Sequence, residues 1–166
     1  MKEFITDLLT KVNNSKKNIL NKNNLISVSN TISADTHISD VVLTPKMRDD
    51  TSLDINQFDF ITSYDSSTKE ITIKNGLYLT RKIVSIGSTL LSTSPSTVSF
   101  MIGIKHGNEY EQIVSENRKG ICSNSDFFLV DDTNHTFTIN ITASNTDSSN
   151  SIKISATYEF YPLYYF

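Results

Sequence analysis

The sequence predicts an all-β fold, an antiparallel sandwich or barrel, and three observations support this. Apolar and polar residues alternate over several short segments, as in strands with one buried face. Polar stretches of turn-forming residues separate these segments, namely YDSST, KHGN, VDDTN and SNTDSSN. No part of the chain alternates helical with strand patterns, which argues against a parallel nucleotide-binding sheet.

The first predicted element is a helix over residues 2–12. Its apolar residues recur at spacings of three and four and form one stripe. They are Phe4, Ile5, Leu8, Leu9 and Val12. A helix this short is marginally stable alone in water, so we expect it to dock on another surface. It either caps its own domain or attaches the protein to a partner, and these five residues are the candidate attachment segment.

Residues 13–52 are predicted to be an extended arm that contains one or two short strands. The segment is dense in Asn and Ser, its helix propensity is low and no apolar period persists. Thr44 before Pro45 marks a turn or an extended step. We expect so polar an arm to lie against another chain. The predicted domains are therefore a helix and attachment arm over 1–52, and a β-rich head over 53–166.

Alternating segments follow one another through the head. They are FDFIT, EITIK, GLYLTRKIVSIG, TVSFMIGIK, HTFTINIT and SIKISATYEFY. The clearest is HTFTINIT, in which Phe137, Ile139 and Ile141 alternate with Thr and Asn. Several short antiparallel strands at this spacing are typical of a β-sandwich or barrel.

Composition and charge exclude several classes of partner. The net charge of −3 is too small to predict a charged partner, and no basic cluster indicates nucleic acid. No apolar run approaches the length of a membrane span, so membrane insertion is not expected. The single cysteine, Cys122, cannot form an internal disulfide.

Catalytic chemistry has little support in the sequence. The three histidines are far apart and lack metal-ligand spacing. They are His37, His106 and His135. Asp131 and Asp132 could join Asp147 or Glu116 in a calcium site, although an acidic turn is the favoured interpretation. No nucleophile elbow, phosphate loop or Cys–His pairing is present. We therefore predict no catalytic, cofactor or metal residues, with a β-sandwich carbohydrate hydrolase as the enzymatic alternative.

The order of motifs over residues 55–163 resembles the C1q/TNF-like jelly-roll family, as found in trimeric bacteriophage head-fibre, decoration and receptor-binding proteins. The stretch YDSSTK leads into an alternating strand and then Gly76, and the later motifs follow in the family's order. These later motifs are SFMIGIKHGNEY, FFLVDDTNHTFTINI and SIKISATYEFYPL. Lys69 stands where the family has Gly, Leu79 replaces an aromatic residue, and the closing strand lacks the family's Gly.

The resemblance implies a jelly-roll sandwich that forms a homotrimer around a three-fold axis, with apolar and aromatic residues toward the axis. The candidate trimer-interface residues are Tyr78, Tyr158, Phe160, Tyr161 and Leu163. We expect one face of the closing strand to contact neighbouring subunits and the other to contact its own core. Gly76 is expected where a positive φ or the close approach of another chain is needed.

The function expected from these features is that of a virion structural protein of a bacteriophage. It would be a trimeric head fibre or capsid decoration protein, and its N-terminal segment would bind another virion protein. The alternative is a receptor-binding protein whose head binds a host surface glycan or protein. Neither function requires a cofactor.

Overall fold

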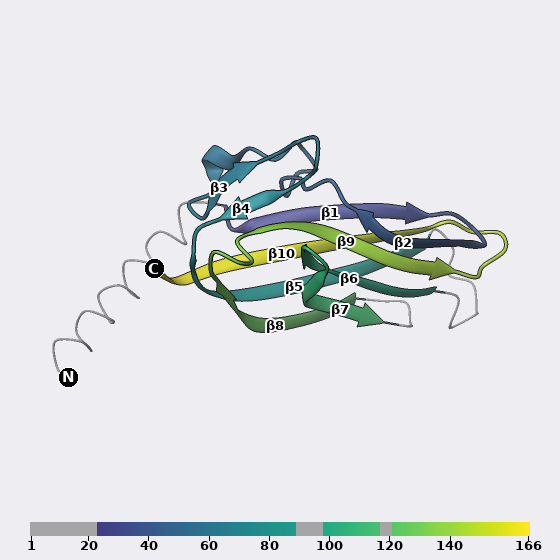
Figure 1. Cartoon of the computed structure of the whole chain (residues 1–166). Helices are drawn as coiled ribbons and strands as arrows, with labels where there is room; N and C mark the ends of the chain where they lie inside the picture. The colour runs from purple at the N-terminus through teal and green to yellow at the C-terminus, as the bar shows by residue number, and fades with distance from the viewer. Residues whose placement is uncertain (1–22, 89–97, 117–120) are drawn as a thin grey trace.

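The computed structural model describes residues 23–88, 98–116 and 121–166 (Figure 1). These residues contain a short 3-10 helix, η1 (Ile55–Gln57), and ten strands. The strands are β1 (Leu25–Ile32), β2 (Thr36–Val42), β3 (Ile61–Tyr64), β4 (Ile71–Ile73), β5 (Gly76–Ser88), β6 (Val98–His106), β7 (Glu109–Glu116), β8 (Ile121–Val130), β9 (Thr136–Asn145) and β10 (Ile152–Tyr165).

The strands form two antiparallel sheets that enclose one core. The four-stranded sheet has the order β1-β10-β5-β8, and the six-stranded sheet has the order β3-β4-β9-β6-β7 with β2 beside β9. The pairing is nested, because β1 pairs with β10, β4 with β9, β5 with β8 and β6 with β7. A long hairpin rolled into two sheets gives this order, which is that of a jelly roll. The predicted all-β antiparallel sandwich is confirmed.

Residues 23–52 belong to this sandwich, which corrects the predicted domain boundary at residue 52. β1 pairs with β10 over its whole length, and β2 pairs with β9. Ile26, Val28 and Ile32 of β1 are buried in the core. The strand pattern here is short and surrounded by Asn and Ser, so it was too weak to be recognised as part of the head. The segment is held in place by its pairing with β10 and β9 of the same chain.

Most of the alternating segments form strands as predicted, and FDFIT is the exception. Phe58 and Phe60 lie before β3, outside any strand. The backbone N–H of Phe58 donates to the Ile55 carbonyl and ends η1, while the Asp54 side chain accepts from the Asn56 N–H at 3.1 Å. Both phenyl rings are nevertheless buried, so the apolar pattern predicted burial but the wrong backbone.

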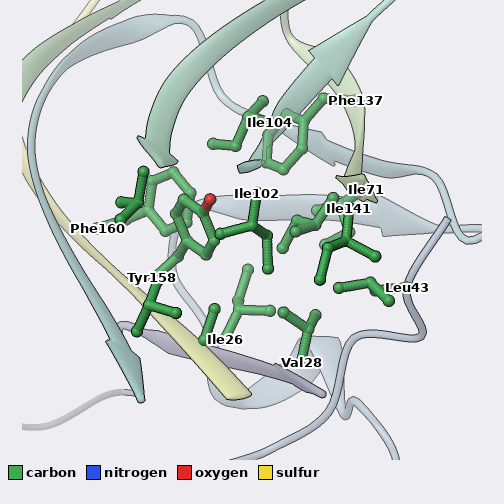
Figure 2. Packing of buried hydrophobic residues seen from close by; sticks show 14 of the residues in the cluster. Ile26, Val28, Leu43, Ile71, Ile102, Ile104, Phe137, Ile141, Tyr158 and Phe160 are labelled. Carbon is green, nitrogen blue, oxygen red and sulfur yellow. The ribbon is translucent and has the colours of Figure 1, made fainter. Parts of the chain in front are cut away.

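The core is filled by apolar residues from both sheets. Figure 2 shows Tyr158 and Phe160 of β10 near Ile102 and Ile104 of β6, with Phe137 of β9 close by. All five are at most 1% exposed. Each such side chain contributes roughly 1.5–3 kcal/mol relative to an exposed position. The two sheets are therefore held face to face by the inward residues of their central strands.

Two glycines occupy positions where a side chain would be costly. Gly107 lies in the turn between β6 and β7 with φ of 56°, in the left-handed region that favours glycine. At Gly76 an added Cβ would clash with the Tyr164 carbonyl oxygen. The close approach expected at Gly76 thus exists, but it is made by the closing strand of the same chain.

Candidate self-association surface

The outward face of the four-stranded sheet carries two neighbouring rows of apolar side chains. Paired residues on adjacent strands share a face of a sheet, so the register defines the rows. The first row runs Phe127–Leu79–Tyr161, and the second runs Leu129–Leu77–Tyr164. We call these six residues the outer apolar patch. It lies on three adjacent strands, β8, β5 and β10.

The edge strand β8 contributes the most exposed part of the outer apolar patch. Phe127 is 64% exposed and Leu129 is 55% exposed, while Leu77 and Leu79 are half-buried. The ring of Phe166 lies 5.7 Å from that of Tyr164 and extends the apolar surface to the last residue. Contiguous exposed apolar surfaces are typical of sites that bind another molecule, so this face is the candidate self-association surface.

Polar groups border the outer apolar patch on the next row of the sheet. The Tyr161 hydroxyl donates to Glu159 Oε2 at 2.8 Å, and Arg81 Nη1 lies 3.7 Å from the same oxygen. Burial and the neighbouring Glu159 carboxylate raise the pKa of Tyr161, so this hydroxyl remains protonated. The arrangement is an apolar centre with a charged border, as in many subunit interfaces.

Three of the five candidate trimer-interface residues lie inside the chain's own core, which corrects their assignment. Tyr78, Tyr158 and Phe160 are each 0% exposed, so no surface of theirs is left for a neighbouring subunit. They occupy the inward face of β5 and β10, where side-chain alternation alone could not tell inward from outward. Burial raises the pKa of Tyr158, because a phenolate is poorly solvated in this core.

The other two candidates lie on or beside the outward face. Tyr161 belongs to the outer apolar patch and is half-buried. Leu163, also half-buried, sits where the register of β10 against β5 shifts between Pro162 and Tyr164. These two residues remain candidates for an interface. One face of β10 contacts the chain's own core, as expected, and the contact of its other face with neighbouring subunits stays a prediction.

Sequence reasoning missed Phe127 and Leu129, the two most exposed members of the patch. A signal was present in the run FFLV, because apolar residues at consecutive positions face both sides of a strand. Phe128 and Val130 point inward and are buried, which leaves Phe127 and Leu129 on the outer face. The candidate attachment residues Phe4, Ile5, Leu8, Leu9 and Val12 lie outside the described residues.

A polar cluster lies on the outward face of the other sheet. Asp40, in a bulge of β2 with φ of 53°, accepts hydrogen bonds from Lys105, Tyr110 and Asn140. These donors, led by Lys105, lower the pKa of Asp40 to about 2. The carboxylate therefore stays ionised and paired, which suits a structural connection of β2 to β6, β7 and β9 better than proton transfer.

The histidines occupy separate places in the described part of the fold. His106 Nε2 lies 3.0 Å from Glu111 Oε1, and His135 Nδ1 lies 3.1 Å from the Asp131 carbonyl oxygen. Asp131 also accepts from the backbone N–H of Thr133 at 2.8 Å, as in an acidic turn. Among residues 23–88, 98–116 and 121–166, no group of three or more His, Cys, Asp or Glu side chains could hold a metal ion.

A search for spanning segments in the same described residues finds no helix with the length and apolar character to cross a membrane.

Comparison with known proteins gives likenesses at the level of solved structures. No protein-family model matches the chain, and no curated protein matches it. The vertex protein P5 of PRD1 is 14% identical with a TM-score of 0.42, over 81% of this chain and 95% of that one. Murine APRIL is 12% identical with a TM-score of 0.38, over 79% and 98% of the two chains. A Broad Bean Stain Virus chain is 10% identical with a TM-score of 0.36, over 79% and 76%. Because these identities and TM-scores are low, the assignment of a jelly-roll fold rests on the strand order of the chain itself.

Proposed function

We propose that this protein is a virion structural protein that assembles as a homotrimer, a head fibre or capsid decoration protein of a bacteriophage. The observation that carries the self-association is the outer apolar patch. The core of the described chain is already filled by inward residues, so the patch is surplus to the monomer's own folding. Covering Phe127 and Leu129 on another copy would remove the two most exposed side chains of the patch from water.

The geometry of the patch suits a trimer in which each contact joins two different parts of the patch, one from each neighbouring subunit. β8 is the last strand of its sheet, so the patch begins at an edge and continues onto the sheet face at β10. In a closed ring each subunit can place the edge part of its patch against the face part of the next subunit. The charged border of Arg81 and Glu159 would then fix the orientation of the contact.

Attachment to the particle is assigned to the N-terminal segment, on the apolar stripe of residues 4–12. The virion location extends the resemblance of the sequence motifs to phage jelly-roll proteins. Neighbouring genes test this location. Capsid and portal genes beside this one would support decoration of the head, whereas tail genes would argue for a host-attachment role instead.

The oligomeric state is the direct test of the proposed assembly. Light scattering after size-exclusion chromatography should give three chain masses over a wide concentration range. A mass of one chain at every concentration would overturn the trimer and, with it, the role given to the outer apolar patch.

A further inference from the structure

A largely buried polar cluster lies between the two sheets, close to their last strands, β7 and β8. Lys82 of β5 points inward and is 1% exposed, and its Nζ donates to Gln112 Oε1 of β7 at 3.0 Å. The Thr80 hydroxyl lies within hydrogen-bond distance of the same Gln112 oxygen and, at 3.0 Å, of the Asp126 carbonyl oxygen. Two side chains of β5 thus share one acceptor on the opposite sheet.

Gln112 also reaches β8 and β10. Its Nε2 donates to the Phe127 carbonyl oxygen at 3.4 Å. The backbone carbonyl oxygen of Gln112 accepts from the Tyr158 hydroxyl at 3.4 Å. One residue of β7 therefore connects to three strands of the other sheet. We call Gln112 and its partners Thr80, Lys82 and Tyr158 the Gln112 cluster.

A strained backbone places the Gln112 side chain in this position. Gln112 has φ of 52°, which is unusual for a residue other than glycine. The register of β7 shifts here, so that Gln112 and Ile113 together oppose Gly103 of β6. Such a bulge redirects a side chain. A strained conformation persists only where surrounding contacts compensate for it, and the Gln112 cluster supplies those contacts.

The part of β8 next to the cluster has little else to hold it. Asn124 and Asp126 share the inward face with Lys82 and Thr80, yet both are exposed. Phe127 is exposed on the other face. Apolar packing holds β8 at its two ends, through the half-buried Cys122 at the start and the buried Phe128 and Val130 farther along. Over residues 123–127, all of which are exposed, the strand is therefore held mainly by its ladder to β5 and by the Gln112 cluster.

We propose that Gln112 is a positioning residue that clamps β8 to the body of the sandwich and so sets Phe127 for self-association. The inference rests on the self-association proposed above. The bond to the Phe127 carbonyl fixes the backbone of the residue that carries the most exposed ring of the patch. Burial, only partly offset by the charge of Asp126, lowers the pKa of Lys82. The Gln112 Oε1 accepts a hydrogen bond from this buried amine at 3.0 Å.

The test is Gln112→Asn, with Glu111→Gln as the matched control. Asn tolerates the left-handed backbone but is one methylene shorter, so its amide cannot reach Lys82 and Phe127 together. Glu111 bonds His106 outside the cluster. Hydrogen exchange in dilute protein should show residues 121–130 exchanging about tenfold faster in Gln112→Asn, while β9 and β10 keep their protection. Sedimentation should show association about tenfold weaker, with the control unchanged.

Unchanged exchange of β8, or equal loss of protection in all strands, would overturn the clamp. If Gln112→Asn does not fold, the double variant Gln112→Asn with Lys82→Met removes the stranded ammonium and should show the same faster exchange of β8. A wild-type protein that is monomeric throughout would defeat the proposed assembly. The exchange comparison would then decide, by itself, whether Gln112 holds β8.

Discussion

Phe160 lies at the centre of the aromatic part of the core, where its ring packs against three others. Its ring centroid lies 5.1 Å from that of Phe60, 6.2 Å from Tyr78 and 6.1 Å from Phe137. We expect Phe160→Ala to destabilise the fold by about 3–5 kcal/mol, because it leaves a cavity among these rings. Ile26→Ala should also cost about 2–5 kcal/mol, since Ile26 is buried in the same core. Urea denaturation measures both, and a loss under about 1 kcal/mol at either site would contradict the described packing.

At the scale of single residues, Asp40 makes the stability of the fold depend on pH, and the direction of that dependence follows from its pKa. Its pKa is lowered from 3.8 to about 2, so the folded state binds the proton less readily than the unfolded state. The resulting stabilisation is present above the unfolded pKa and is lost as the pH falls through about 2. Because the side chain is 43% exposed, solvent screening limits it to on the order of 1 kcal/mol.

Melting curves of the wild type and Asp40→Asn test this expectation. The difference in melting temperature should be constant above about pH 5 and should shrink as the pH falls from about 4 to below 2, since Asp40 then becomes protonated. A difference that does not change with pH would show that Asp40 acts through packing alone. Lys105→Met should reproduce the effect, because Lys105 is the main donor to this carboxylate.

At the scale of elements, β1 is the first described strand of the folded head, which therefore includes residues before 53. It forms the edge of the four-stranded sheet and buries Ile26, Val28 and Ile32. Deleting residues 1–22 should leave the melting temperature and the trimer unchanged but abolish joining to the particle. Deleting residues 1–34 should unfold the chain, because residues 152–159 of β10 lose their partner strand and the core loses three buried side chains. Circular dichroism compares the two truncations, and equal melting would contradict the place of β1.

At the scale of the whole molecule, the outer apolar patch connects the monomer to its assembly. Phe127→Ser combined with Leu129→Ser should yield a folded monomer, since both residues are exposed and lie outside the core. Val42→Ser is the matched control, because Val42 is 41% exposed but lies on β2, away from the patch. Sedimentation velocity separates the outcomes. A double variant that still forms trimers would place the subunit interface elsewhere.

The sequence by itself determined the class of fold and most of the strands. Strict alternation, as in HTFTINIT, fixes which residues of a strand share a face, and turn residues fix where strands end. It also indicated that Tyr158 and Phe160 lie on one face of the closing strand. These features depend on residues near one another in the chain, so they can be predicted without knowing the pairing.

Only the tertiary structure decided which face points inward and which strands meet. β1 pairs with β10 more than a hundred residues along the chain, so the short pattern LISVS could not reveal that it completes the sandwich. The expected interface residues Tyr78, Tyr158 and Phe160 lie in the core. The exposed apolar residues of the outer face are instead Phe127 and Leu129. The Gln112 cluster joins residues from three separate strands. The physical reason is common to all of these: alternation gives two faces, and only the second sheet determines which of them is shielded from water.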